Sequence, residues 1–184
     1  MEFVKRNIKI YIVSGKSNSG KDTVANIIKE KFVNKKVVSL AYASYLKMYA
    51  EEVLGWDGND STKPREFLQT LGVELIKKQI NDKMLINRII EDIKVYSYFY
   101  DIVVITDARF PEEIENIKNE FDNVTVIHMC DRGNELTEAE KMHATEVSLD
   151  GYHNYDYEIN NNGTLEELKE KVDKIVGETY DSRG

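Results

Sequence analysis

The sequence predicts an α/β fold in which helices cover both faces of a central parallel sheet, in three layers. Three observations carry this prediction. Short apolar segments alternate with longer segments of helical periodicity, the pattern of successive strand–helix–strand units. Residues 101–106 form a nearly continuous apolar run, which is typical of a strand buried on both faces of a parallel sheet. A glycine-rich segment, residues 15–23, joins the first apolar segment to the first helical one.

Five segments have the apolar and β-branched composition of strands. The first precedes the glycine-rich segment, the third is the apolar run already described, and the last is short. The predicted strands are residues 8–13, 36–42, 101–106, 124–128 and 155–159.

Between these strands, apolar residues recur at helical spacing, which predicts amphipathic helices. Pro64 and Pro111 can each open a helix at its first position, and Thr164 with Glu167 has the spacing of a capping box. Four helices are predicted to begin after residue 23, Pro64, Pro111 and Thr164. Two more are predicted to cover 44–54 and 83–94, and a further one takes up part of 134–146. Residues 55–63 predict a polar loop.

Length and composition predict one domain, residues 1–178, with a polar tail over 179–184. The net charge of −8 argues against a nucleic-acid polymer as partner, since binding its backbone requires a basic face. The single cysteine, Cys130, rules out an internal disulfide and suits a reducing cytosol. No apolar run is long enough for a bilayer and no signal-peptide core is visible, so we expect a cytoplasmic protein without a membrane partner.

The glycine-rich segment has the spacing of a phosphate-binding P-loop: a glycine, four residues, then Gly20 and Lys21. Backbone N–H groups and the dipole of the following helix would face an anion, and Lys21 supplies positive charge for the β- and γ-phosphates. An ordinary glycine-rich turn has no need of that lysine. We therefore predict a P-loop NTPase fold that binds a nucleoside triphosphate through Gly15, Lys16, Ser17, Asn18, Ser19, Gly20, Lys21, Asp22 and Thr23.

Position 22 departs from the common motif, which has a serine or threonine there to contact Mg²⁺. Asp22 can reach the metal directly or through water, or the hydroxyl of Thr23 can take over. The sequence leaves both alternatives open.

A second candidate constellation follows the apolar run 101–106. Ligands of open parallel sheets bind at the carboxyl ends of the strands, which places Asp107 where an acidic residue would meet Mg²⁺ or a phosphate acceptor. Arg109 can hold a phosphate with two parallel hydrogen bonds. In the alternative interpretation, Asp107 caps the following helix and Arg109 is an exposed surface residue.

A third candidate surface lies on the helix predicted after Pro64. At α-helical spacing, Arg65, Gln69 and Gly72 lie on one stripe beside the apolar face. A glycine inside a helix costs about 1 kcal/mol relative to alanine, which a ligand or a closely passing backbone would justify. The alternative is an ordinary amphipathic helix with a solvated arginine.

Three further residues, His128, His153 and Cys130, have no metal-ligand spacing among them, and we interpret them as structural. The turn 160–163 can pass near a nucleotide base, although turn chemistry alone explains its composition.

Taken together, these motifs resemble the deoxynucleoside monophosphate kinases of bacteriophages, within the P-loop nucleotide kinase superfamily. The resemblance rests on residues 14–23, 65–74, 106–113, 143–146 and 155–161, and it covers most of the chain in order. The aspartate at position 22 is shared with that family. Ala108 stands where a valine is often found, a change that leaves Asp107 and Arg109 in place.

The resemblance implies transfer of the γ-phosphate of ATP to a deoxynucleoside 5′-monophosphate, with Mg²⁺. It implies an acceptor-binding region over about 44–95 and a lid over about 131–150, from which Arg132 would stabilise the transferring group. Arg65 and Arg109 would hold the acceptor phosphate, and Gln69 and Glu74 would lie near its nucleoside. Asp107 would assist the metal, together with Asp22 or Thr23, or orient the acceptor; Lys21 would neutralise charge.

Two alternatives remain at this stage. One is a P-loop kinase for another small phosphorylated acceptor, because the animal phosphomevalonate kinases also carry a Gly-Lys-Asp loop. The other is a nucleotide-binding regulator without turnover. The resemblance implies the host cytoplasm as location and, since members are often dimeric, a homodimer. Base specificity, the preference between ribose and deoxyribose, and the roles of His143 and Glu146 stay open.

Overall fold

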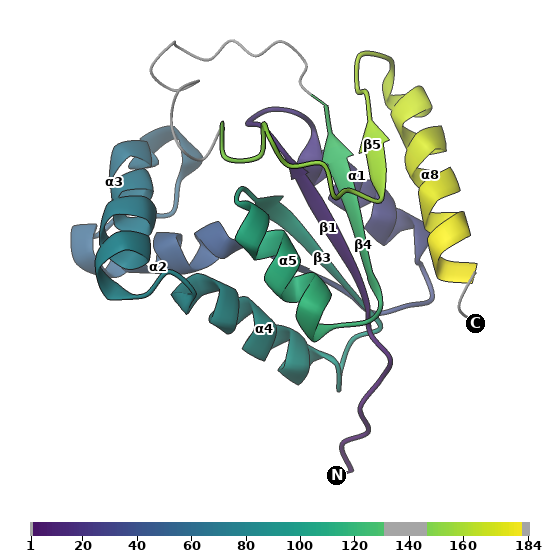
Figure 1. Ribbon diagram of the computed structural model, residues 1–184, viewed down its shortest axis with the longest axis horizontal. Coiled ribbons are helices and arrows are strands. Elements are labelled where there is room, and N and C mark those ends of the chain that lie inside the picture. The colour runs from purple at the N-terminus through teal and green to yellow at the C-terminus, as the bar shows by residue number, and fades with distance from the viewer. Residues whose placement is uncertain (1, 131–146, 182–184) are drawn as a thin grey trace.

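The computed structural model describes residues 2–130 and 147–181, and within them a five-stranded sheet in which every neighbouring pair is parallel. The strand order is β2-β3-β1-β4-β5. The strands are β1 (Lys9–Gly15), β2 (Val37–Leu40), β3 (Ile102–Ala108), β4 (Val124–Met129) and β5 (Tyr157–Ile159). Helices lie on both faces, so the predicted three-layer α/β/α fold is confirmed (Figure 1).

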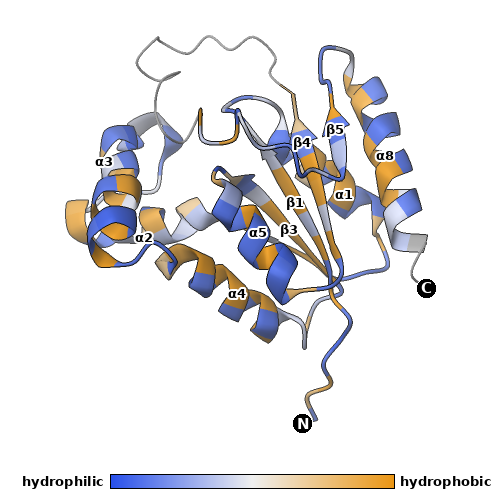
Figure 2. Ribbon diagram, in the orientation of Figure 1, coloured by the Kyte–Doolittle hydropathy of each residue, from blue (hydrophilic) through white to orange (hydrophobic). Residues whose placement is uncertain are grey.

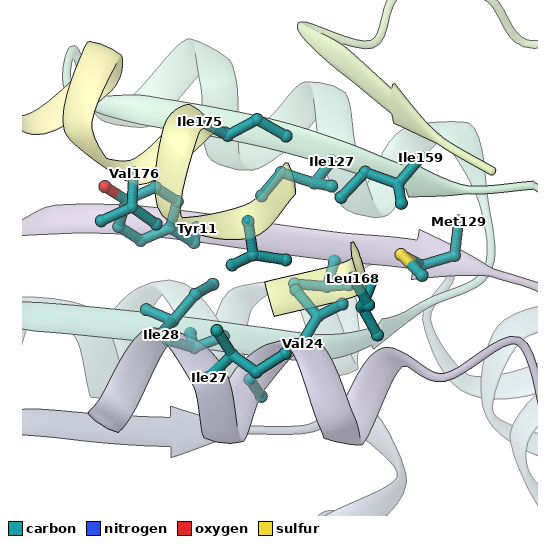
Figure 3. Packing of buried hydrophobic residues seen from close by; sticks show 14 of the residues in the cluster. Tyr11, Val24, Ile27, Ile28, Ile127, Met129, Ile159, Leu168, Ile175 and Val176 are labelled. Carbon is teal, nitrogen blue, oxygen red and sulfur yellow. The ribbon is translucent and has the colours of Figure 1, made fainter. Parts of the chain in front are cut away.

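Two apolar cores lie on opposite faces of the sheet, because successive residues of β1 point to opposite sides. Tyr11 and Val13 pack with α1 (Lys21–Lys31) and α8 (Leu165–Asp181). Ile10 and Ile12 pack with α4 (Met84–Tyr96) and α5 (Pro111–Glu120). Figure 2 shows apolar residues along the central strands, and Figure 3 shows the first of these cores between the sheet and its helices.

A helical group between β2 and α4 lies to one side of the sheet (Figure 1). It consists of α2 (Tyr42–Leu54), the short 3₁₀ turn η1 (Asp60–Thr62), α3 (Arg65–Thr70) and η2 (Leu71–Ile80). The last of these is a π-helix that continues α3 without a break, where the sequence predicts an ordinary α-helix. Long π-helical segments are rare and are often found near functional sites.

Two helices differ at one end from the sequence-based expectation. Helix α2 begins at Tyr42 rather than at residue 44, because a carboxylate from β3 accepts hydrogen bonds from its first amides. Helix α8 continues to Asp181, so the first residues of the expected polar tail are helical. Thr179 hydrogen-bonds the hydroxyl of Tyr11 at 3.1 Å, and the ring of Tyr180 packs on Phe32 at 4.7 Å between centroids. The helix predicted within 134–146 lies outside the described residues.

None of the helices in the described part of the chain is long and apolar enough to cross a membrane.

Candidate active site

The glycine-rich loop connects the carboxyl end of β1 to the first turn of α1, as predicted. Gly15 and Gly20 have φ angles of 135° and 98°, which side-chain-bearing residues rarely adopt. A Cβ atom on Gly15 would lie 2.6 Å from the carbonyl oxygen of Met129, and one on Gly20 would lie 2.5 Å from Nδ2 of Asn161. Both glycines are therefore required by conformation and by close neighbours.

The side chain of Lys21 is buried and folds back over its own loop. Its Nζ donates a hydrogen bond to the carbonyl oxygen of Lys16 at 2.5 Å and lies 3.5 Å from Oγ of Ser19. The ammonium group is thus held within the loop, where its positive charge would attract a bound phosphate.

The loop is braced from two later parts of the chain. Nδ2 of Asn161, in the turn after β5, donates to the carbonyl oxygen of Ser19 at 3.0 Å. Nζ of Lys16 lies 3.3 Å from a carboxylate oxygen of Asp150. Neither contact was predicted from the sequence, because Asn161 lies in a run that ordinary turn chemistry explains.

Asp107, at the end of β3, lies beside the start of α2. Its two carboxylate oxygens accept hydrogen bonds from the backbone N–H groups of Tyr42 and Ala43, both at 2.8 Å. Burial raises the pKa of Asp107, while these amides and the charges of Arg109 and Lys21 act in the opposite direction. Asp107 therefore caps helix α2. The alternative interpretation expected it to cap the helix that follows it in the sequence instead.

Arg109 reaches from the end of β3 to the P-loop. Its Nη2 lies 3.4 Å from Oγ of Ser17, so the structure brings the two predicted constellations together. The turn that carries Arg109 is held by Glu113, whose Oε2 accepts from the backbone N–H groups of Arg109 at 2.6 Å and Phe110 at 3.1 Å. Burial raises the pKa of Glu113 to about 8. Sequence reasoning missed this role of Glu113.

Two cationic side chains, Lys47 of α2 and Arg65, lie near enough to Lys63 for their charges to act on it, and the charge of Asp22 also acts on Lys63. We call Lys47, Lys63 and Arg65 the lysine–arginine group. Burial, followed by the positive charge of Lys47, lowers the pKa of Lys63; the charge of Arg65 acts in the same direction, and Asp60 and Asp22 act against it. Like charges placed together repel one another unless an anion compensates them. Only Arg65 of this group was predicted from the sequence.

The helix of the third surface changes form near its last predicted member. Arg65 and Gln69 lie on α3, whereas Gly72 is the second residue of the π-helix η2. A Cβ on Gly72 would lie 3.1 Å from Cδ1 of Leu46, so a side chain of α2 makes a close approach there. Gln69 is half-buried, and Glu74 is exposed with an oxygen 2.7 Å from Nζ of Lys78.

The described ranges, 2–130 and 147–181, contain no group of three or more carboxylate, imidazole or thiol side chains with an arrangement that could hold a metal ion. The candidate metal ligands are therefore separate oxygen donors: Asp22 and Thr23 in the first turn of α1, and Asp107. Arg132, His143 and Glu146, and with them most of the predicted lid, lie outside the described residues.

A cavity of about 290 Å³ lies beside the P-loop, between the ends of β4 and β5. His128, Cys130 and His153 line it with Gly15 and Lys16. The ring of His128 stacks on Tyr155 at 4.2 Å, and its Nδ1 lies 3.2 Å from Oγ of Ser14. Burial lowers the pKa of His128.

Solved structures with a similar fold include kinases. The APS kinase CysC of Mycobacterium tuberculosis, in complex with AMPPNP and APS, has a TM-score of 0.56 and 13% identity over 94% of this chain and 99% of that one. A putative kinase from Chloroflexus aurantiacus has a TM-score of 0.53 and 12% identity over 95% of this chain and 98% of that one. At such identities the likeness shows the fold alone, and together with the glycine-rich loop it places the chain in the P-loop fold class.

A family follows from the sequence. Residues 39–172 match the model of the family "Deoxynucleotide monophosphate kinase", and the chain belongs to this family. The deoxynucleotide monophosphate kinase of Escherichia phage RB69 is 31% identical over 121 residues, which cover 64% of this chain and 46% of that protein. The match therefore spans slightly less than half of the relative's length. The family match contains the lysine–arginine group, Asp107 and Asn161, whereas the P-loop precedes it.

Proposed function

We propose that the protein transfers the γ-phosphate of ATP to a deoxynucleoside 5′-monophosphate, producing the diphosphate and ADP, with Mg²⁺. The observation that carries this proposal is the pairing of two anion sites. The P-loop holds the ammonium of Lys21, and the charge of Asp22, the next residue, acts on Lys63 of the lysine–arginine group. A kinase with a phosphorylated acceptor needs two phosphate sites close together, whereas a simple nucleotide-binding protein needs one.

On the donor side, the loop and the amino end of α1 supply backbone N–H groups for the triphosphate. When phosphate binds, the ammonium of Lys21 exchanges the Lys16 carbonyl and the Ser19 hydroxyl for phosphate oxygens. The side chain is already buried in the loop, so little rearrangement is needed before it can stabilise the developing charge.

On the acceptor side, Lys47, Lys63 and Arg65 offset the charge of the incoming monophosphate. Arg109 lies beside Ser17 of the donor loop, and we assign it the binding of both the donor and the acceptor phosphate. Gln69 and Glu74 are retained as candidates near the acceptor nucleoside, and Arg132 as a candidate for the transferring group.

Mg²⁺ prefers oxygen ligands and keeps several waters, which fits the separate donors Asp22, Thr23 and Asp107. The bound metal would neutralise charge on the phosphates. Because both oxygens of Asp107 already accept backbone hydrogen bonds, we assign it first the role of holding α2 against the P-loop.

The proposal is tested by incubating the protein with ATP and Mg²⁺ and measuring ADP formation against all common deoxynucleoside and nucleoside monophosphates, with phosphomevalonate as a further acceptor. We expect turnover with one or a few deoxynucleotides. Turnover with phosphomevalonate alone would favour the other kinase class, and ATP binding without any turnover would favour a regulator.

The matched variants in this assay are Lys21→Ala and Lys29→Ala, both on α1. The first removes the loop ammonium and should abolish turnover, whereas the second changes an exposed lysine two turns further on and should leave it unchanged. Near-normal turnover of Lys21→Ala would contradict the assignment of the P-loop.

A further inference from the structure

The turn between β5 and α8 reaches the P-loop from the far end of the sequence. Asn161 in this turn is 4% exposed, and its Nδ2 donates to the carbonyl oxygen of Ser19 at 3.0 Å. The same nitrogen occupies the position that a Cβ on Gly20 would need, at 2.5 Å. Asn161 is thus fitted against one peptide unit, the one that joins Ser19 to Gly20.

This turn is itself anchored on two neighbouring elements. Nζ of Lys171, on α8, donates to the carbonyl oxygen of Asn160 at 2.9 Å. The backbone N–H of Cys130, after β4, donates to the carbonyl oxygen of Ile159 at 2.9 Å. These two hydrogen bonds hold the backbone next to Asn161, so its side-chain amide is already positioned beside the P-loop before a ligand binds.

The hydrogen bond from Asn161 determines the direction of the backbone N–H group of Gly20. A trans peptide is planar, so its C=O and N–H groups point in opposite directions. With the carbonyl of Ser19 held toward Asn161, the N–H of Gly20 must point to the opposite side. Without this bond the peptide could turn over, because glycine has few conformational restrictions, and a carbonyl oxygen would then face the phosphates.

We propose that Asn161 is a positioning residue that holds the Ser19–Gly20 peptide in its phosphate-binding orientation and so sets the affinity of the protein for a nucleoside triphosphate. This inference rests on the proposed donor site, but it assigns a role to a residue that is not among the predicted substrate-binding residues. It predicts a selective effect: donor binding weakens when the amide is lost, while acceptor binding does not.

The test measures ATP binding by titration calorimetry in the full chain, for wild type, Asn161→Ala and Asn161→Leu, with Asn162→Ala as the matched control. Leucine keeps most of the volume without the donor, so it separates the hydrogen bond from packing, and Asn162 is the exposed neighbour in the same turn. We expect about tenfold weaker ATP binding for both Asn161 variants, the range of one buried hydrogen bond, and no change for the control. In turnover assays, KM for ATP should rise and KM for the acceptor should stay within twofold.

A double-mutant cycle adds a second readout. Gly20→Ala should weaken ATP binding less in the Asn161→Ala background than in wild type, because the clash at 2.5 Å is gone there. If the effects of the two substitutions on ATP affinity were additive, they would contradict a direct contact between Gly20 and Asn161. Asn161 variants that bind ATP as wild type does, or that raise both KM values equally, would overturn the inference while leaving the kinase proposal intact. A wild type that binds ATP but phosphorylates no acceptor would overturn the kinase proposal, and the binding comparison would still decide the role of Asn161.

Discussion

At the scale of single residues, the buried carboxyl of Glu113 makes the site sensitive to pH. It holds the turn of Arg109 through two backbone hydrogen bonds. Burial raises the pKa of Glu113, and the negative charge of nearby Asp107 raises it further. The pKa in the fold is about 8 against an unfolded value of 4.5. The protonated form is therefore favoured by folding, and this contribution to stability is present below the unfolded pKa and lost as pH rises through about 8.

We expect the free energy of unfolding of the wild type to fall between about pH 5 and pH 9 by on the order of a few kcal/mol more than that of Glu113→Gln, which cannot ionise. Urea unfolding at both pH values measures the difference. Asp107, whose pKa is also raised, contributes in the same direction in both proteins. Equal pH dependence of the two proteins would show that the Glu113 carboxyl is not held protonated.

The lysine–arginine group makes a separate prediction at this scale. Lys47→Ala and Lys63→Ala should each raise KM for the acceptor about tenfold, by the loss of one charge-assisted contact, and should leave KM for ATP nearly unchanged. Lys83→Ala, at an exposed position before α4, is the control. Steady-state kinetics with either substrate varied separates the effects, and a rise in KM for ATP alone would assign these lysines to the donor instead.

At the scale of the elements, the sequence predicted most helices and all five strands, because periodicity and capping are local properties. It did not predict η2, because the spacing of apolar residues does not separate an α-helix from a π-helix over so short a segment. Nor could it predict the start of α2, which is fixed by Asp107, a residue distant in sequence. Gly72, for which a ligand or a closely passing backbone was one explanation, lies against the side chain of Leu46.

That contact gives a stability prediction. Gly72→Val should destabilise the protein by about 1–3 kcal/mol, because the added atoms overpack the contact with Leu46. Gly177→Val on α8 is the matched control, since an added Cβ there meets nothing within 4 Å. Chemical denaturation of both variants makes the comparison. A neutral Gly72→Val would mean that α2 and η2 can move apart freely.

At the scale of the whole molecule, the parallel sheet and the joining of the P-loop to Asp107 and Arg109 were predictable, because the carboxyl ends of parallel strands share one edge of the sheet. The contacts of the loop with Asn161 and Asp150, and the proximity of Lys47 to Lys63, were not predictable. Both depend on tertiary packing, for which a single sequence holds no local signal.

A ligand that binds only the folded state stabilises the whole molecule. ATP with Mg²⁺ at a hundredfold excess over its Kd should add about 2.7 kcal/mol and raise Tm by about 5–10 °C. Differential scanning fluorimetry measures the shift, and Lys21→Ala should show a much smaller one. An unchanged Tm for the wild type would contradict the donor site as a whole.

The strand order has a consequence for how this protein is made. Both strands that flank β1, namely β3 and β4, come from the second half of the chain. While the chain emerges from the ribosome, β1 is therefore unpaired until β3 and β4 have been synthesised. Long-range parallel pairing of this kind forms slowly. The P-loop gains the hydrogen bond from Asn161 only after a further 142 residues have been synthesised beyond Ser19. A nascent chain halted before β5 should therefore not yet hold the nucleotide site in its final shape.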